Sequence, residues 1–77
     1  MYKLICTSYN ETEQGLVLRN NWIEEVEDDD HLLLFVKQWE LPDDFTYPSK
    51  GSISNILPGK ATIGDNTLIV HVRIIRF

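Results

Sequence analysis

The sequence predicts an α+β fold, in which one helix packs on a small, mostly antiparallel sheet of four or five strands. Residues 67–77 alternate apolar and mixed positions and are rich in β-branched side chains, which is typical of an interior strand buried on one side. Residues 31–39 place apolar side chains at spacings of three and four, which is typical of a helix. Because only one helix is predicted, its apolar stripe is most simply buried across one face of the sheet.

The first strand is predicted at residues 2–9, where alternate side chains are apolar. One face of this strand would carry Tyr2, Leu4 and Cys6. The polar residues 10–15 end in glycine and are long enough for a hairpin loop with a bulge, so we expect a second strand after them.

Strand character returns at residues 16–19, and two asparagines follow. Asn20 and Asn21 could form a tight turn, because Asn tolerates positive φ angles. They could equally form a bulge through which the strand continues to Trp22 and Ile23. We favour continuation, because these two apolar residues would otherwise have no partner element.

The stretch 31–39 can be interpreted in two ways. As a helix it would bury Leu32, Phe35, Val36 and Trp39 on one face, with Leu33 beside them. The three aspartates before it offer an N-cap and a favourable charge for the helix dipole, and Leu41-Pro42 supplies a stop. Leu34 would then point to solvent. As a strand, the stretch would instead favour a small all-β barrel, and this alternative stays open.

The second half of the chain has shorter elements. A long connection follows the helix, and residues 52–57 form a short strand at best. Pro58-Gly59 is a turn signal. Residues 60–63 are expected to form a hairpin with residues 67–72.

The closing strand is predicted to organise the fold. Its apolar face consists of Leu68, Val70, Val72 and Ile74. The order strand, strand, helix, short strand, long strand resembles the β-grasp arrangement of ubiquitin-like proteins, in which the last strand lies centrally beside the first. The resemblance covers element order alone, and the sequence ends in Arg76-Phe77 rather than in a Gly-Gly tail.

Length and composition indicate a single compact domain over residues 1–77. Cys6 is the sole cysteine, which excludes an intramolecular disulfide, and its place in an alternating strand predicts a buried side chain. The start of the chain shows no signal-peptide pattern, and the longest apolar run, residues 32–36, is too short to cross a membrane. We therefore expect a cytoplasmic protein in a reducing setting.

Charge is the most informative feature of the sequence. The span 24–44 contains nine acidic residues and one basic residue, Lys37, so its formal charge is −8. The rest of the chain has six basic and three acidic residues, which gives +3. The nine are Glu24, Glu25, Glu27, Asp28, Asp29, Asp30, Glu40, Asp43 and Asp44. The chain is thus polarised rather than uniformly acidic.

These acidic residues, together with Leu34, are the predicted partner-binding site. They would dock on a protein with a basic surface, for example a nucleic-acid-binding protein whose phosphate site they occupy. Small acidic phage inhibitors of host defence nucleases, which act as DNA mimics, resemble the chain in size and charge. Two alternatives stay open: a solvated face that also caps the helix, and a structural or assembly subunit that self-associates through a strand edge. Monomer and homodimer are both compatible with the sequence.

The sequence offers no credible catalytic, metal or cofactor site, so we do not expect an enzyme. The Asp28–Asp30 run lacks the glycine and alternate ligand spacing of an EF-hand loop. His31 could be a pH-sensitive cap or a plain exposed residue, and His71 a structural residue or a base with Cys6 as a speculative neighbour. Net charge −5 opposes direct nucleic-acid binding, even with Lys60, Arg73 and Arg76 in the strands.

Large aromatic side chains border the acidic span. If Trp22, Trp39 and Phe45 were exposed, they would form an aromatic anchor with an acidic rim. If they were buried, they would fill the core of so small a domain.

Overall fold

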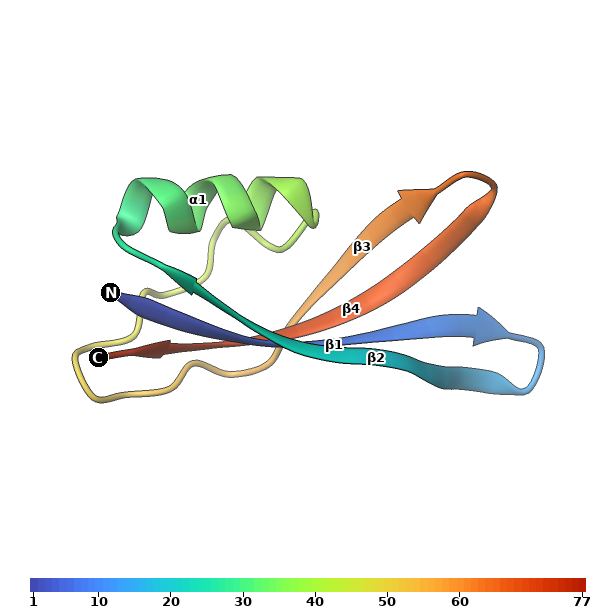
Figure 1. The fold of residues 1–77 in the computed structure, drawn as a ribbon, viewed down its shortest axis with the longest axis horizontal. Helices are drawn as coiled ribbons and strands as arrows, with labels where there is room; N and C mark the ends of the chain where they lie inside the picture. The colour runs from blue at the N-terminus through green and yellow to red at the C-terminus, as the bar shows by residue number, and fades with distance from the viewer.

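The structure, a computed structural model, describes the backbone of residues 1–77 and every side chain except that of Ile63. It contains one helix and four strands (Figure 1). In chain order these are β1 (Tyr2–Thr12), β2 (Gly15–Val26), α1 (Asp29–Gln38), β3 (Leu57–Ile63) and β4 (Asn66–Arg76). The predicted α+β class is confirmed, and the 31–39 stretch is helical.

The strands form one open antiparallel sheet in the order β2-β1-β4-β3. The last strand lies centrally beside the first and runs antiparallel to it, so the likeness to the β-grasp arrangement is limited to element order and to this adjacency. The outer strands β2 and β3 are the edges of the sheet, so the barrel alternative is wrong. The two ends of the chain are therefore neighbours at the middle of the sheet.

The first hairpin is tighter than the sequence indicates. β1 continues to Thr12, so Glu13 and Gln14 alone connect it to β2, and the predicted loop over residues 10–15 is wrong. The last three residues of β1 are exposed, and here the strand needs no apolar face because no helix covers it.

The predicted continuation of the second strand is confirmed, and a bulge makes it possible. β1 and β2 pair as Ser8–Asn20 and then as Tyr9–Leu18, which leaves Arg19 as an additional residue in β2. A bulge of this kind bends the strand and increases its twist. The asparagine pair therefore interrupts the register without ending the strand.

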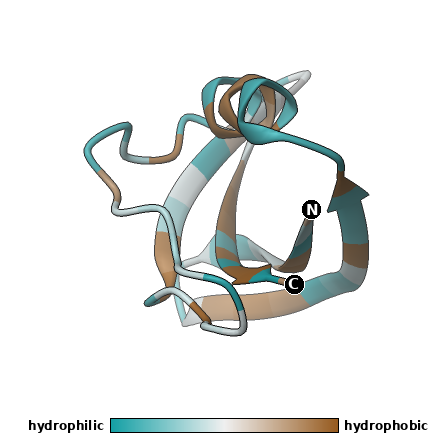
Figure 2. Ribbon diagram, turned by 90° about the vertical axis from the view of Figure 1, so that its left-hand side faces the viewer, coloured by the Kyte–Doolittle hydropathy of each residue, from teal (hydrophilic) through white to brown (hydrophobic). Residues whose placement is uncertain are grey.

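β4 supplies the centre of the hydrophobic core, as its alternating pattern predicts. Its alternate side chains are at most 3 % exposed: Leu68, Val70, Val72 and Ile74. The buried helix side chains are Leu32, Phe35 and Val36. Figure 2 shows the sheet curving beneath the helix, which lies along one side of it.

The helix begins two residues earlier than predicted, at Asp29, and ends at Gln38 with Trp39 as its C-cap. Leu34 is 65 % exposed, as the helical interpretation requires. A ten-residue helix is too short to be stable alone in water, so the buried stripe that faces the sheet holds it in place.

The predicted turn at Pro58-Gly59 is wrong, because both residues lie inside β3. β3 is an edge strand, and the Lys60 N–H points away from β4 and donates to the Trp39 carbonyl oxygen at 2.8 Å. Alternate residues of a strand point the same way, so the N–H that Pro58 lacks would also have faced away from the ladder. Proline therefore costs this strand no ladder bond.

The connection from the helix to β3 is irregular, as the sequence predicts. The short strand considered at residues 52–57 reduces to one bridge between Ile53 and Ile75, and β3 starts at Leu57. The tilted rings of Phe45 and Tyr47 lie 4.7 Å apart between centroids and pack this connection against the end of the sheet, where the Tyr47 ring lies 6.4 Å from the Tyr2 ring. The hairpin predicted between residues 60–63 and 67–72 is confirmed.

Candidate protein-docking surface

The nine acidic side chains of the 24–44 span are all exposed, and the helix separates them into two groups. The N-terminal acidic group consists of Glu24, Glu25, Glu27, Asp28, Asp29 and Asp30. The C-terminal acidic group consists of Glu40, Asp43 and Asp44. The ten residues of α1, of which Asp29 and Asp30 are the first two, span about 15 Å at 1.5 Å per residue. Negative charge therefore lies at both ends of one short helix.

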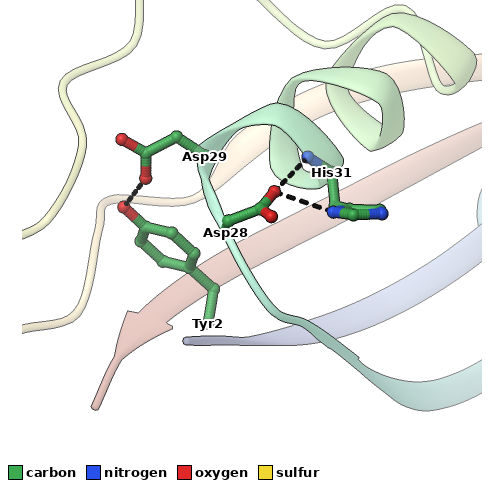
Figure 3. A network of polar contacts seen from close by, with 4 residues as sticks. All are labelled: Tyr2, Asp28, Asp29 and His31. Atoms are coloured by element: carbon green, nitrogen blue, oxygen red, sulfur yellow. Dashed lines mark hydrogen bonds and ion pairs between the residues drawn. The ribbon is translucent and has the colours of Figure 1, made fainter.

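Asp28 is the N-cap of the helix (Figure 3). Its Oδ1 accepts a hydrogen bond from the His31 backbone N–H at 2.9 Å and lies 2.7 Å from the His31 Nδ1. The hydrogen bonds from His31 lower the pKa of the Asp28 carboxyl, and the hydrogen bond to Asp28 raises the pKa of the imidazole. The pH-sensitive cap considered from the sequence thus has a geometric basis.

We expect this pair to make the stability of the helix depend on pH. Because the pKa of His31 is raised in the folded state, its contribution is complete below its ordinary value of 6.5 and is lost as the pH rises through the raised value. Because the pKa of Asp28 is lowered, its contribution is present above 3.8 and is lost as the pH falls through the lowered value. Both side chains are exposed, so solvent screening keeps the effect small.

NMR titration of the His31 ring checks this expectation. Asp28→Asn keeps a cap acceptor but removes the charge, so it should return the pKa of His31 toward its ordinary value without unfolding the helix. A His31 pKa that is the same in both proteins would contradict the pairing.

Asp29 ties the start of the helix to the sheet. Its Oδ1 accepts a hydrogen bond from the Tyr2 hydroxyl at 2.5 Å (Figure 3), and this bond raises the pKa of the buried Tyr2. The Arg76 guanidinium lies over the same ring, 5.7 Å from its centroid, and lines the hollow beside Asp28 and Asp29. One positive side chain of β4 therefore lies next to the N-terminal acidic group.

Glu40 sits in an unusual backbone conformation for its residue type. Its φ is 51°, in the left-handed region, and its N–H donates to the Lys37 carbonyl while the Leu41 N–H donates to the Val36 carbonyl. These two bonds form the helix-ending motif in which glycine is the usual residue at this position. The left-handed conformation costs a residue with a side chain about 1–2 kcal/mol.

Leu34 lies on the outward side of the helix between the two acidic groups. Leu33 beside it is half-buried, and Lys37 follows one turn later. Among the described side chains, no lysine or arginine forms an ion pair with an acidic residue; the ion pair that the structure contains is His31–Asp28. The carboxylates are therefore not neutralised by direct pairing within the chain.

The aromatic residues that border the span do not form an exposed anchor. Trp22, Trp39 and Phe45 are half-buried and pack against the core. The two tryptophan rings lie 5.4 Å apart, and the Trp22 Nε1 donates to Glu24 at 3.2 Å. Leu34 is thus the exposed apolar residue on the helix, whereas the two tryptophans pack against the hydrophobic core.

Cys6 and His71 lie on opposite faces of the sheet, so the speculative pairing of the two is wrong. His71 pairs with Thr7 in the register, whereas Cys6 is fully buried on the helix side. Burial raises the pKa of the Cys6 thiol to about 12, which keeps it protonated at neutral pH. His71 instead packs against Tyr9, with the two rings tilted and their centroids 5.1 Å apart.

Two further observations concern sites of other kinds. Among the residues whose side chains are described, no three His, Cys, Asp or Glu residues are grouped so that they could hold a metal ion. No helix within the described chain has the length and apolar character needed to cross a membrane.

Two residues near the acidic groups, Tyr2 and Arg76, were not predicted from the sequence as part of the site, and for Glu40 the left-handed backbone conformation was not predicted. Tyr2 and Arg76 meet because they pair in the β1–β4 register, which becomes visible only when the first and last strands are known to be neighbours.

Comparisons with protein-family models, curated proteins and solved structures give no significant match.

Proposed function

We propose that the chain is a small acidic protein-binding module that docks the helix side of the molecule on a partner with a basic surface. The observation that carries the proposal is a set of nine exposed carboxylates on the segments that lead into, begin and follow one helix, with an exposed leucine on that helix. A fixed negative surface steers a basic partner and orients it, and an apolar contact at its centre adds affinity.

The state of the carboxylates supports docking over simple solvation. Asp28 is needed to cap the helix, and Asp29 is needed to link the start of the helix to Tyr2 of the sheet. The remaining acidic side chains make no described bond that the fold needs, apart from the contact of Glu24 with an indole. Asp30 lies in the first turn, where its charge favours the helix dipole. Six of the nine are therefore in excess of what the helix uses.

Glu40 supports the same proposal from the backbone. Glycine would relieve the left-handed strain at this position, and a negative charge at the C-terminal end of a helix opposes the helix dipole. The chain thus carries a carboxylate where local stability favours a neutral glycine. A role for this side chain outside the fold accounts for that choice.

The class of partner that fits the charge is a protein that itself binds nucleic acid. Such a protein has a basic groove for phosphates, and carboxylates on a short rigid helix can occupy it. In this form the chain acts as an inhibitor that mimics the charge of DNA, as the resemblance in size and charge to small acidic phage inhibitors implies. Docking of this type is expected to weaken as salt rises.

Leu34→Ser tests the apolar centre of the surface. Because Leu34 is 65 % exposed, we expect its replacement to change the free energy of unfolding by less than about 0.5 kcal/mol and to weaken partner binding about tenfold. The partner is first isolated by capture from the native host lysate on the wild-type chain at low salt, and its affinity is then measured in solution.

The matched control is Val17→Ser, which removes a side chain of similar exposure (52 %) from the far end of the β1–β2 hairpin. It should leave partner binding unchanged. Equal affinities for the Leu34→Ser and wild-type chains would remove the helix from the docking surface.

A further inference from the structure

The two edges of the sheet differ in how their backbone groups are satisfied. On the β3 side, the Lys60 N–H is bonded to the Trp39 carbonyl, and Pro58 has no N–H to offer. Further along the same side, segment 51–54 is bonded to Ile74 and Arg76 of β4. Among the described backbone bonds, none joins β2 to any element other than β1.

The register shows which groups of β2 face outward. Both backbone groups of Ile74 bond to Ser54, away from β1, so its partner Leu4 must exchange hydrogen bonds with β2. Leu4 is opposite Glu24, and pairs of this kind recur at every second residue. In β2, Trp22 and Glu24 therefore bond to β1.

The residues between these ladder positions point their backbone groups out of the sheet. They are Asn21, Ile23 and Glu25. The Asn21 N–H agrees with this assignment, because it donates to the Asn20 Oδ1 at 2.9 Å instead of to β1. The outward groups of Ile23 and Glu25 have no partner within the described backbone bonds.

Apolar side chains accompany this free edge. Ile23 is 62 % exposed and lies opposite Ile5, on the side of the sheet away from the helix. Leu16 and Leu18 lie on the same side further along β2 and are also exposed, and Figure 2 shows apolar segments along this strand. An uncovered edge strand with exposed apolar side chains is a template for pairing with another strand.

We propose that β2 pairs antiparallel with β2 of a second copy of this chain, about a two-fold axis near Trp22 and Ile23. The product is one continuous sheet of eight strands, four from each copy. An isologous contact of this kind requires a self-complementary segment, and the charge along β2 meets that requirement.

The complementarity follows from the positions of the charged residues in β2. With the axis at Trp22, Glu24 of one copy faces Asn20 of the other, and Glu25 faces Arg19. With the axis at Ile23, both glutamates face the uncharged pair Asn21 and Trp22. In neither register do two carboxylates lie opposite each other, which would be destabilising.

The strongly acidic start of the helix does not oppose this pairing. Glu27 lies four or five residues from the axis, which is about 15 Å at 3.3 Å per residue, and its counterpart lies equally far on the other side. A separation of about 30 Å is several Debye lengths at physiological salt. Pairing involves Glu24 and Glu25 of the N-terminal acidic group, whereas the helix with Leu34 and the other seven carboxylates lies outside the paired strand, so dimerisation does not depend on the proposed docking function.

Amide hydrogen exchange at two protein concentrations tests the pairing directly. In the wild-type chain, Trp22 and Glu24 amides should be protected at both concentrations, because they bond to β1. Ile23 and Glu25 amides should become protected only as concentration rises. Protection of the two outward amides that does not change up to about 1 mM, where even a weak complex forms, would overturn the proposal.

Sedimentation equilibrium of two matched variants gives the second test. Ile23→Lys and Leu34→Lys make the same change at positions of nearly equal exposure, 62 % and 65 %. Ile23→Lys should raise the dimer dissociation constant at least tenfold, and Leu34→Lys should leave it unchanged. A dimer weakened equally by both, or by Leu34→Lys alone, would overturn the β2 assignment, and thermal melting confirms that both variants are folded.

Discussion

Gly59→Ala is expected to destabilise the protein by about 3 kcal/mol, since overpacking a tight contact typically costs 1–3 kcal/mol or more. A Cβ atom at this position would lie 2.5 Å from the Trp39 carbonyl oxygen and 2.5 Å from the Leu41 Cδ2. The leucine tip can move, but the carbonyl belongs to the backbone that ends the helix and accepts the Lys60 N–H. Because each kcal/mol lowers the melting temperature of a domain of this size by about 4–8 °C, the melting temperature should fall by roughly 12 °C or more.

Gly64→Ala is the control for this prediction. Gly64 has a φ of 61° and open space around a Cβ atom, so alanine there introduces backbone strain without overlap. That strain costs about 1–2 kcal/mol. If Gly59→Ala cost no more than Gly64→Ala, the close approach of β3 to the end of the helix would be contradicted.

Leu32→Ala is expected to cost about 3 kcal/mol, within the 2–5 kcal/mol measured for buried leucines. Leu32 is fully buried, and it is one of three side chains by which the helix is held on the sheet. A domain of this size has a total stability of only about 4–12 kcal/mol, so the loss is a large fraction of it. Urea unfolding should show a lower midpoint.

Leu34→Ala on the same helix provides the matched control. It removes the same atoms two residues away, at a position that is 65 % exposed, and should cost less than about 0.5 kcal/mol. Equal losses at the two positions would mean that the helix is rotated relative to the described packing.

The major elements could be predicted because their periodicities are strong. Leucines and aromatics at spacings of three and four gave the helix, and alternating β-branched residues gave β4 and its buried face. Both signals arise because one side of each element is buried, and the hydrophobic effect that drives this burial is the dominant favourable contribution to folding. The exposure of Leu34 followed from the same pattern.

The errors in the prediction have a different physical origin. Pro58-Gly59 resembles a turn locally, yet on an edge strand proline loses no ladder bond, and glycine is needed where β3 meets the Trp39 carbonyl. Whether a strand lies at an edge depends on the whole sheet, so a local signal cannot reveal it. The contact of Tyr2 with Asp29 likewise depends on where distant segments meet.

Two triple charge reversals test whether the acidic residues around the helix dock on a basic partner. One variant carries Asp30→Lys, Asp43→Lys and Asp44→Lys, which spares the cap and the link to Tyr2. The control carries Glu11→Lys, Glu13→Lys and Asp65→Lys, which are exposed residues of the hairpin ends. Each set changes the formal net charge from −5 to +1.

The measurement is the affinity of each variant for the captured partner over a range of salt concentrations. We expect the helix-side reversal to weaken binding about 100-fold or more at low salt and to flatten its salt dependence, while the control stays within about threefold of wild type. Equal losses in both folded variants, or none in either, would contradict this expectation, because net charge alone would then explain the binding and the acidic groups would be only a solvated face.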